Sequence, residues 1–498
     1  MNIAVSNRIY INLGDLTEDQ IKQLKEMFTY ENPKYQTALD YGWKTDDIDR
    51  YICTFKVQDG KLSLPRGRLK DIDKVLGTPP IKDERLYFNE FDDSDIVFGG
   101  IKLEGFQMIA ENLFDRGDDV FLRAPTGSGK TEMALYAIAQ LEQPTLIIVP
   151  NKNIMDEWIP RIMQRFDLED DDIGKMGGGY QSSIKYITVG IKNTVINNNV
   201  KLRDKFGLIV CDEAYSYGAK TFNSVVDLFP ARYRLGLSAW EKRKDSMEFL
   251  IYDQFGTDIV EITLEEIESS GRVVPVRTYM VKTEFNSNSR SRPILINKMT
   301  EDEDRNCLIL KLAKMLTDQG EKIVIFSERI EHCRLLQTLL ETNGMDSAIL
   351  MGKLNIGTES LKGVKEMFED DIISVLITNR VGVEGISISV LSSAICTYPV
   401  FKSIGDVEND KSIALQQAGR VRRKHEGKSI AKYFYLWDHK ILPGDMVKMT
   451  GTFGHDKVRI LDNGERAKLD AISVKYESPP AMQKLFEFSN QFVKNWRS

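Results

Sequence analysis

The sequence contains few cysteines and no long apolar run. Its five cysteines are widely scattered among 498 residues, with no CxxC pair and no metal-ligand spacing. This pattern argues against a disulfide framework or a zinc centre, so reduced thiols are expected. No apolar run approaches the roughly 18 residues that a membrane-spanning helix needs. The start, MNIAVSNRIYINLGD, lacks the basic flank and apolar stretch of a signal peptide. We therefore expect a cytoplasmic protein with no membrane role.

The sequence also lacks an excess of basic residues. Its formal net charge is -7, whereas proteins that coat nucleic acid through bulk electrostatics are basic. Any nucleic-acid site must therefore be a local basic channel, and the acidic balance leaves a protein partner open. The hydrophobic share of 42% is ample for several cores, and a chain of this length can form about three domains.

Short apolar strands alternate with helical patterns twice between residues 100 and 440. The first series includes "TLIIVP" and "FGLIVCDEA", and the second includes "KIVIFSE" and "ISVLITN". Such alternation is typical of parallel sheets covered by crossover helices. We predict an α/β fold with two tandem parallel-sheet lobes after a small α+β module. The expected ranges are 1–90 for the N-terminal module, 96–270 and 271–440 for the lobes, and 441–498 for an unassigned extension.

The N-terminal module carries a helix start and two arginines of interest. Thr17 and Gln20 have the spacing of a capping box before an apolar helical face. Arg66 and Arg68 follow two predicted strands, and we expect them to contact a DNA duplex or junction. A solvated hairpin turn explains these two arginines equally well.

The strongest chemical signal is "APTGSGKT", residues 124–131, between the apolar "VFL" and a helical pattern. This strand-loop-helix context predicts a phosphate-binding loop, although Ala124 stands where the strict pattern has glycine. Glycines let backbone N–H groups turn toward phosphate oxygens, and the following helix adds its positive end. Lys130 is expected to reach the β and γ phosphates of ATP, and the Thr131 hydroxyl to hold Mg²⁺. The predicted nucleotide-binding residues of the loop are Pro125, Thr126, Gly127, Ser128, Gly129, Lys130 and Thr131.

Two carboxylates, Asp212 and Glu213, follow the apolar residues 208–211 directly. Alone they could be solvated acids at the end of a strand. Beside a phosphate loop, Asp212 is expected to be the outer-sphere partner of Mg²⁺. Glu213 is expected to orient and deprotonate the attacking water.

At this point the chain resembles the superfamily 2 helicases and translocases of the DExD/H-box type, over roughly residues 100 to 440. "APTGSGKT" looks like motif I, "DEAY" like motif II and "QQAGRVRR" like motif VI. The resemblance implies RecA-like lobes and assigns Gln416, Arg420 and Arg423 to the nucleotide. Arginines from the second lobe then stabilise charge on the γ phosphate and make hydrolysis depend on lobe closure.

Two aromatic residues depart from the family pattern. Tyr215 replaces the usual last residue of motif II, and Trp240 ends "LSAW", which is similar to motif III. The resemblance implies coupling between ATP hydrolysis and movement through Tyr215, Ser238 and Gly385 of motif V. Core packing of the two aromatic side chains is the alternative.

Weaker resemblances follow the family's order along the chain. Gln107 resembles the glutamine that reads adenine, although a surface glutamine is nearly as plausible. Other matches imply contacts to the phosphate backbone of one strand, which position a strand without reading its sequence. These residues are Asn151, Lys152, Thr194, Thr378 and Asn379.

Residues 253–275 are similar to the segment that joins the lobes in the XPB-like branch and in phage recombination helicases of the UvsW type. The resemblance implies an ATP-dependent DNA helicase or translocase that uses ATP and Mg²⁺. Its expected partner is single-stranded, forked or branched DNA, remodelled in recombination, replication or repair. Three alternatives remain: an RNA helicase, a restriction-type motor subunit, and a catalytically silent nucleic-acid-binding module.

Overall fold

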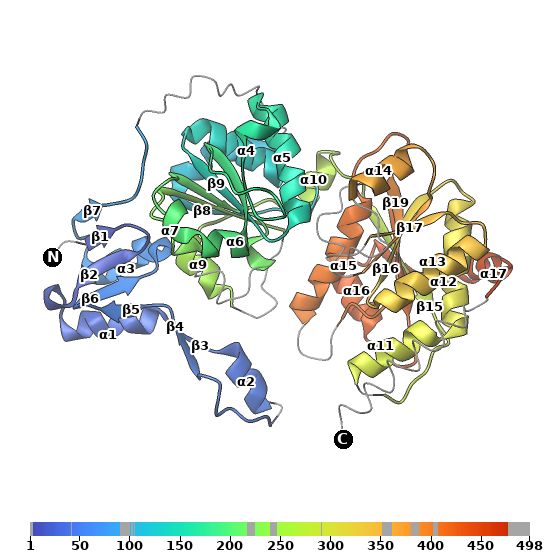
Figure 1. The fold of residues 1–498 in the computed structure, drawn as a ribbon. Helices are drawn as coiled ribbons and strands as arrows, with labels where there is room; N and C mark the ends of the chain where they lie inside the picture. Colours follow the sequence, from blue (N-terminus) through green and yellow to red (C-terminus); the bar gives the residue numbers. More distant parts are fainter. Residues whose placement is uncertain are drawn as a thin grey trace. The chain divides into compact units, whose positions relative to one another are not determined.

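The computed structural model describes residues 3–40, 42–89, 100, 103, 105–216, 225–239, 247–289, 291–350, 361–379, 388–401 and 407–476. The chain divides into two compact units, residues 1–267 and 268–498. Figure 1 traces the elements of each unit in chain order. Among the described helices, none combines the length and apolar character needed to cross a bilayer.

The first unit begins with a five-stranded mixed sheet in the order β5-β6-β2-β1-β7. Only β1 and β7 pair in parallel. Helices α1 and α3 contribute buried side chains to the module's core, beside those of the strands. The predicted capping box of Thr17 and Gln20 is present at the start of α1. The module's elements are β1 (Ile3–Val5), β2 (Ile9–Asn12), η1 (Leu13–Asp15), α1 (Glu18–Met27), β3 (Thr29–Glu31), α2 (Pro33–Asp40), β4 (Tyr51–Cys53), β5 (Lys56–Gln58), β6 (Lys61–Leu64), η2 (Arg66–Arg68), α3 (Leu69–Leu76) and β7 (Ile81–Asp83).

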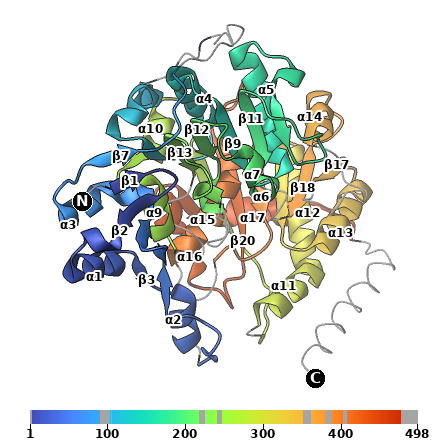
Figure 2. The ribbon, with the colours of Figure 1, turned by 60° about the vertical axis from the view of Figure 1, so that its left-hand side comes forward.

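A seven-stranded sheet, wholly parallel, forms the rest of the first unit in the order β10-β11-β9-β12-β13-β8-β14. Figures 1 and 2 show α4 and α5 on one side of this sheet and α6, α7 and α9 on the other. Its strands are therefore buried on both faces, which explains their continuous apolar runs. The elements are η3 (Gly105–Arg116), β8 (Asp119–Arg123), α4 (Lys130–Leu141), β9 (Thr145–Val149), α5 (Lys152–Phe166), η4 (Asp170–Asp172), β10 (Gly174–Met176), β11 (Ile187–Ile191), α6 (Lys192–Asn197), α7 (Asn199–Leu202), β12 (Leu208–Cys211), η5 (Ala214–Ser216), β13 (Tyr233–Ser238), α9 (Phe249–Phe255), β14 (Ile259–Glu261) and α10 (Leu264–Ser269).

The N-terminal module is fastened to this sheet by buried polar contacts. Arg66 is 1% exposed and binds Asp119 through two nitrogens, one of them Nε at 2.9 Å from Oδ2. Its remaining N–H groups donate to the backbone carbonyls of Ser6, Ala231 and Arg232. All five guanidinium donors can be used in such a site. Buried hydrogen bonds of Arg66 thus join the N-terminal module to the first parallel sheet.

The predicted DNA contact through Arg66 is therefore wrong. A side chain that is buried against Asp119 has no surface to offer to a duplex. Arg68 is part-buried and donates to Asp71 (2.9 Å) and to the Tyr30 hydroxyl (3.1 Å). Gly67, between them, lies where an added Cβ would be 2.6 Å from backbone atoms of residues 254–256. The stretch "RGR" therefore belongs to the junction of the module with the first parallel sheet.

A buried carboxylate forms a second attachment point. Asp253 of α9 accepts hydrogen bonds from the hydroxyls of Tyr30 (2.7 Å) and Thr54 (2.5 Å). Burial raises the pKa of Asp253 to about 6, opposed by these two hydrogen bonds and by the charges of Arg68 and Arg8. The ring of Tyr30 also stacks on Phe249, with 4.0 Å between the centroids. The antiparallel pair of β3 and β4 is thus held at one end.

This raised pKa predicts a pH-dependent stability. The folded state favours the neutral form of Asp253, whose pKa is about 6 in the fold and about 4 in the unfolded chain. The neutral carboxyl group therefore stabilises the fold fully below about pH 4, and this stabilisation is lost as the pH rises through about 6. Asp253→Asn keeps the shape without the charge. We expect this variant to melt above the wild type at pH 8 by roughly 5 °C, with the gap closing near pH 4. Melting curves from pH 4 to 8 measure the gap.

The control for this prediction is Asp258→Asn, because Asp258 is 64% exposed and pairs with Lys70 on the surface. We expect a small effect from it across the same pH range. A gap for Asp253→Asn that stays constant with pH would contradict the assignment of the titration to this residue.

The second unit is built on another seven-stranded parallel sheet, in the order β17-β18-β16-β19-β20-β15-β21. Alternate strand side chains enter two apolar clusters, one with α14, α15 and α16, the other with α12, α13 and α17. The elements are β15 (Val276–Lys282), α11 (Arg292–Glu301), α12 (Glu303–Thr317), β16 (Lys322–Ser327), α13 (Ile330–Thr342), β17 (Ser347–Leu350), α14 (Leu361–Glu369), β18 (Val375–Asn379), β19 (Leu391–Cys396), α15 (Val407–Val421), β20 (Ala431–Trp437), α16 (Asp445–Phe453), β21 (Val458–Ile460) and α17 (Asn463–Asp470).

The two predicted parallel sheets are confirmed, and both are wider than the sequence indicated. The missed strands are β10, β14, β20 and β21. Three of them have three residues each, too few to show a period. Within the extension, the described residues 441–476 are structured, since β21 pairs with β15 and α17 packs on α12. All five cysteines are unpaired, as expected.

Candidate nucleotide site and strand-binding residues

The predicted nucleotide residues of the first unit gather at one edge of its sheet. Strands β12, β13 and β8 are neighbours and parallel, so their carboxyl ends meet at the same edge. Asp212 follows β12, Ser238 ends β13, and the phosphate loop follows β8. The backbone N–H of Ala124 donates to the Ser238 carbonyl (2.9 Å). The fold therefore brings motifs I, II and III together in the first unit.

The phosphate loop has the backbone that its sequence predicts. Gly127 and Gly129 have φ of 94° and 84°, values that glycine adopts without strain. Lys130 is the first residue of α4, and its ammonium donates to the Ala124 carbonyl (2.8 Å). The Ser128 hydroxyl is buried and has no hydrogen-bond partner among the described residues. A buried polar atom of this kind needs a partner, so the loop fits a phosphate ligand.

Asp212 is held by two hydrogen bonds. Its Oδ1 accepts from the backbone N–H of Glu213 (2.8 Å), and its Oδ2 accepts from the indole N–H of Trp158 (2.8 Å). Burial raises the pKa of Asp212, while the Trp158 hydrogen bond and the Lys130 charge oppose that rise. Glu213 has φ of 48°, which a non-glycine residue rarely adopts. Backbone strain of this sort gathers at functional sites.

Trp158 is a residue that sequence reasoning missed. It is 1% exposed and belongs to the apolar face of α5, with Met155, Ile159 and Ile162. That periodic face was a signal for burial. Nothing in the sequence showed that the indole N–H meets Asp212, 54 residues further along the chain.

Gln107 and Tyr215 are both buried. The Gln107 amide nitrogen donates to the Ser128 carbonyl (2.8 Å), so this side chain supports the phosphate loop. Its reading of adenine stays a prediction. The Tyr215 ring packs edge-to-face on Phe121, with 5.2 Å between centroids, inside the core of the first unit. Core packing is therefore shown for Tyr215, and its coupling role stays a prediction.

The strand-contacting residues predicted in the first unit lie near one another. Asn151 caps α5, with its side-chain oxygen accepting from the Ile154 N–H (3.1 Å), and Lys152 is exposed on the first turn. The glycine turn at 177–179 packs against Thr194 and Lys152. A Cβ added at Gly177 would lie 2.6 Å from Thr194 Oγ1, and one added at Gly178 would lie 3.4 Å from Lys152 Cγ. The exposed Tyr180 ring follows this turn, 5.3 Å from the Lys152 ammonium. These groups form one polar area at the sheet edge.

The site residues predicted in the second unit lie on different elements, and one of them is fully buried. Thr378 and Asn379 end β18, but Thr378 is fully buried and its hydroxyl donates to the Asn379 carbonyl (3.3 Å). No atom of that side chain is exposed to a strand in this conformation. Gln416 and Arg420 lie on α15, and Arg423 follows it. Gly385 and Trp240 lie outside the described residues.

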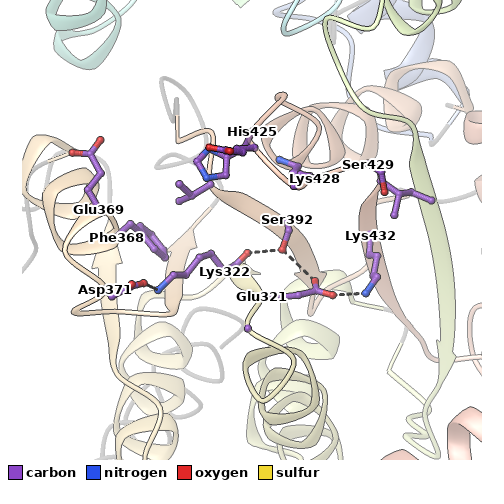
Figure 3. A pocket seen from close by; sticks show the side chains of 15 residues that line it. Glu321, Lys322, Phe368, Glu369, Asp371, Ser392, His425, Lys428, Ser429 and Lys432 are labelled. Carbon is purple, nitrogen blue, oxygen red and sulfur yellow. Dashed lines mark hydrogen bonds and ion pairs between the residues drawn. The ribbon is translucent and has the colours of Figure 1, made fainter.

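A hollow of about 690 Å³ lies in the second unit, and none of the predicted site residues lines it. Its walls come from the amino ends of β16, β19 and β20, opposite the carboxyl edge where Asn379 stands. Figure 3 shows Lys322 pointing toward Asp371, and Glu321 held by Ser392 and Lys432. Lys322, Asp371, Glu321 and Lys432 are thus paired with one another inside this hollow.

Comparison with known proteins gives two family matches in chain order. The family described as type III restriction enzyme, res subunit, matches residues 102–243, and the helicase conserved C-terminal domain matches residues 306–425. The first match lies on the first parallel sheet and the second on the second sheet. Each of the two sheets thus lies in a segment that matches a known protein family.

Individual relatives extend these matches. The chain is 28% identical over 322 residues to "Probable helicase D10" of Escherichia phage T5, covering 64% of this chain and 67% of the relative. It is 23% identical over 459 residues to "ATP-dependent DNA helicase uvsW" of Enterobacteria phage T4, covering 85% and 87%. Among solved structures, S. cerevisiae Dbp5 bound to RNA and ADP BeF3 aligns with a TM-score of 0.54 at 15% identity, over 74% of this chain and 92% of that one. The last likeness shows the fold alone.

The resemblance seen in the motifs is thereby confirmed on independent grounds. Its motifs lie on two parallel seven-stranded sheets, and relatives named as helicases align along most of the chain. This protein belongs to superfamily 2 and is an ATP-dependent helicase with two RecA-like lobes.

Proposed function

We propose that the protein is a DNA helicase or translocase that remodels branched DNA, such as forks and junctions, during recombination, replication or repair. The observation that carries the motor part of this proposal is the closeness of the phosphate loop, with its unsatisfied Ser128 hydroxyl, to the Asp212 and Glu213 pair. The choice of DNA is supported by the T4 relative, which is named a DNA helicase and aligns over 85% of this chain.

In the proposed site, the loop residues and Lys130 bind the ATP phosphates. Thr131 and Asp212 hold Mg²⁺, which when bound neutralises charge on the phosphates. Glu213 accepts a proton from the attacking water. The roles predicted for Gln416, Arg420 and Arg423 stay part of this proposal, and all three residues are present at or next to α15.

We assign the strand contact in the first lobe to Asn151, Lys152 and Thr194, which the glycine turn at 177–179 brings into one polar area. Because Arg66 is buried, a DNA contact of the N-terminal module needs other cations. Lys56 and Lys61 on the exposed hairpin of β5 and β6 are the candidates. The five unpaired cysteines support a reducing, cytoplasmic setting.

The test is steady-state ATP hydrolysis without nucleic acid and with single-stranded DNA, unbranched duplex DNA, forked DNA, a four-way junction or RNA. A binding titration with each of these nucleic acids accompanies it. Lys130→Ala is the control, because it removes the ammonium that the phosphates need and leaves the rest of the chain intact. We expect forks or junctions to stimulate hydrolysis most, and the control to lose that stimulation. A displacement assay on the preferred DNA then separates unwinding from translocation.

The alternatives are distinguishable outcomes of the same panel. Stimulation by RNA alone would move the protein to the RNA helicases. Binding of nucleic acid without any hydrolysis would support the catalytically silent module. Stimulation by unbranched duplex DNA alone would favour the restriction-type motor.

A further inference from the structure

Helix α5 connects two places in the first unit that the proposed function uses. Its first turn carries Asn151 as the cap and Lys152, both assigned to the strand. Two turns later the same helix carries Trp158, whose indole N–H reaches Asp212 at the end of β12. One helix therefore runs from the polar area of the strand contact to the carboxylate assigned to the metal.

The contact between Trp158 and Asp212 is a buried one. Trp158 is 1% exposed and Asp212 is 8% exposed, so water has little access to replace the indole donor. The indole N–H can only donate, and a carboxylate oxygen keeps other lone pairs after accepting one hydrogen bond. The Trp158 hydrogen bond to Oδ2 and the Glu213 backbone hydrogen bond to Oδ1 therefore fix the plane of the Asp212 carboxylate and leave other lone pairs of both oxygens available.

We infer that Trp158 is a positioning residue for the metal site: it orients the Asp212 carboxylate toward Mg²⁺ bound with the nucleotide. The inference rests on the proposed function, because only there is Asp212 a partner of the metal. Groups that hydrogen-bond to metal-site ligands from outside typically change metal affinity by about 10- to 100-fold. Since the helix also carries the strand contact, a shift of α5 on strand binding would move the donor relative to Asp212.

Packing is the competing explanation, since Trp158 also fills the apolar side of α5 with Met155, Ile159 and Ile162. Trp158→Phe separates the two roles because it removes the N–H and keeps an aromatic ring. The matched control is Trp437→Phe in the second unit, where the indole N–H donates to the Leu442 carbonyl (2.9 Å). Each variant loses one indole hydrogen bond.

The experiment measures the Kd of a fluorescent ADP analogue twice, with excess Mg²⁺ and with EDTA. For the wild type and Trp437→Phe we expect tighter binding with Mg²⁺. For Trp158→Phe we expect the gain due to Mg²⁺ to fall about tenfold, with Kd in EDTA unchanged. A gain that stays within twofold of the wild type would overturn the inference. Equal weakening in both conditions would overturn it in favour of packing.

A second measurement needs no variant and so is independent of folding defects. In protein labelled with ¹⁵N at tryptophan, the indole N–H signal of Trp158 should shift when Mg²⁺ is added to the complex with ADP, while that of Trp437 stays in place. An unmoved Trp158 signal in protein that binds the nucleotide more tightly with Mg²⁺ would contradict the inference and leave the proposed function standing. Wild-type protein without Mg²⁺-dependent nucleotide binding would instead overturn the proposed site itself, and this inference with it.

Discussion

Replacing Glu213 with Gln is expected to lower kcat for ATP hydrolysis by about 100- to 10,000-fold, the usual contribution of a general base. Gln has nearly the same size and hydrogen-bonding reach but cannot take a proton from water. Since the loop residues and Asp212 remain, the Kd for ATP should change little. Steady-state hydrolysis with saturating DNA and a separate ATP-binding titration measure the two quantities.

The chain offers a closely matched control in Glu142→Gln. Glu142 is the C-cap residue directly after α4 in the same unit, is exposed, and has the same φ of 48° as Glu213. The same chemical change at the same backbone conformation should leave kcat within about twofold, because exposed substitutions away from a site have small effects. If Glu213→Gln retained more than a tenth of the wild-type rate, another group would have to be the base.

Replacing Arg66 with Ala is expected to destabilise the first unit by about 3–5 kcal/mol, because it leaves the Asp119 carboxylate without its buried partner. Three backbone carbonyls, of Ser6, Ala231 and Arg232, lose donors as well. At roughly 2–4 °C per kcal/mol for domains of 150–250 residues, the fall in Tm should be about 10 °C. Differential scanning calorimetry measures it.

Lys70→Ala is the control, because Lys70 also joins the N-terminal module to the first parallel sheet. Its ammonium binds Asp258 (3.1 Å), but the two side chains are 73% and 64% exposed. Exposed ion pairs contribute about 0–1 kcal/mol, so this variant should melt within a few degrees of the wild type. Equal losses from the two variants would show that burial of Arg66 does not set its contribution.

These contacts have a functional consequence for the proposed motor. Arg66, Arg234 and Asp253 tie the module to strands and helices of the first parallel sheet through buried hydrogen bonds. Breaking such bonds leaves unsatisfied buried groups, which is costly. The module is therefore expected to move together with the first lobe, and any DNA it binds would move with that lobe.

The two sheets and the nucleotide loop could be read from the amino-acid sequence. Apolar runs such as residues 145–149 and 322–327 are local, and burial on both faces makes them visible without knowledge of their neighbours. The loop at 124–131 is equally local, because its glycines and Lys130 act within eight residues. The short strands β14 and β21 were missed, because three residues at a sheet edge take their conformation from the strand beside them.

Only the tertiary structure decided what the polar side chains do. The "RGR" stretch gave no sign that Arg66 meets Asp119, 53 residues away, or that Gly67 needs close contact with α9. Trp158 looked like any apolar residue on a helix, yet its N–H meets Asp212. Thr378 matched a strand-contact motif but is buried at the end of β18. The physical reason is that hydrophobic periodicity reports which face is buried, whereas a hydrogen-bond partner depends on which distant backbone lies within about 3 Å once the sheets have packed.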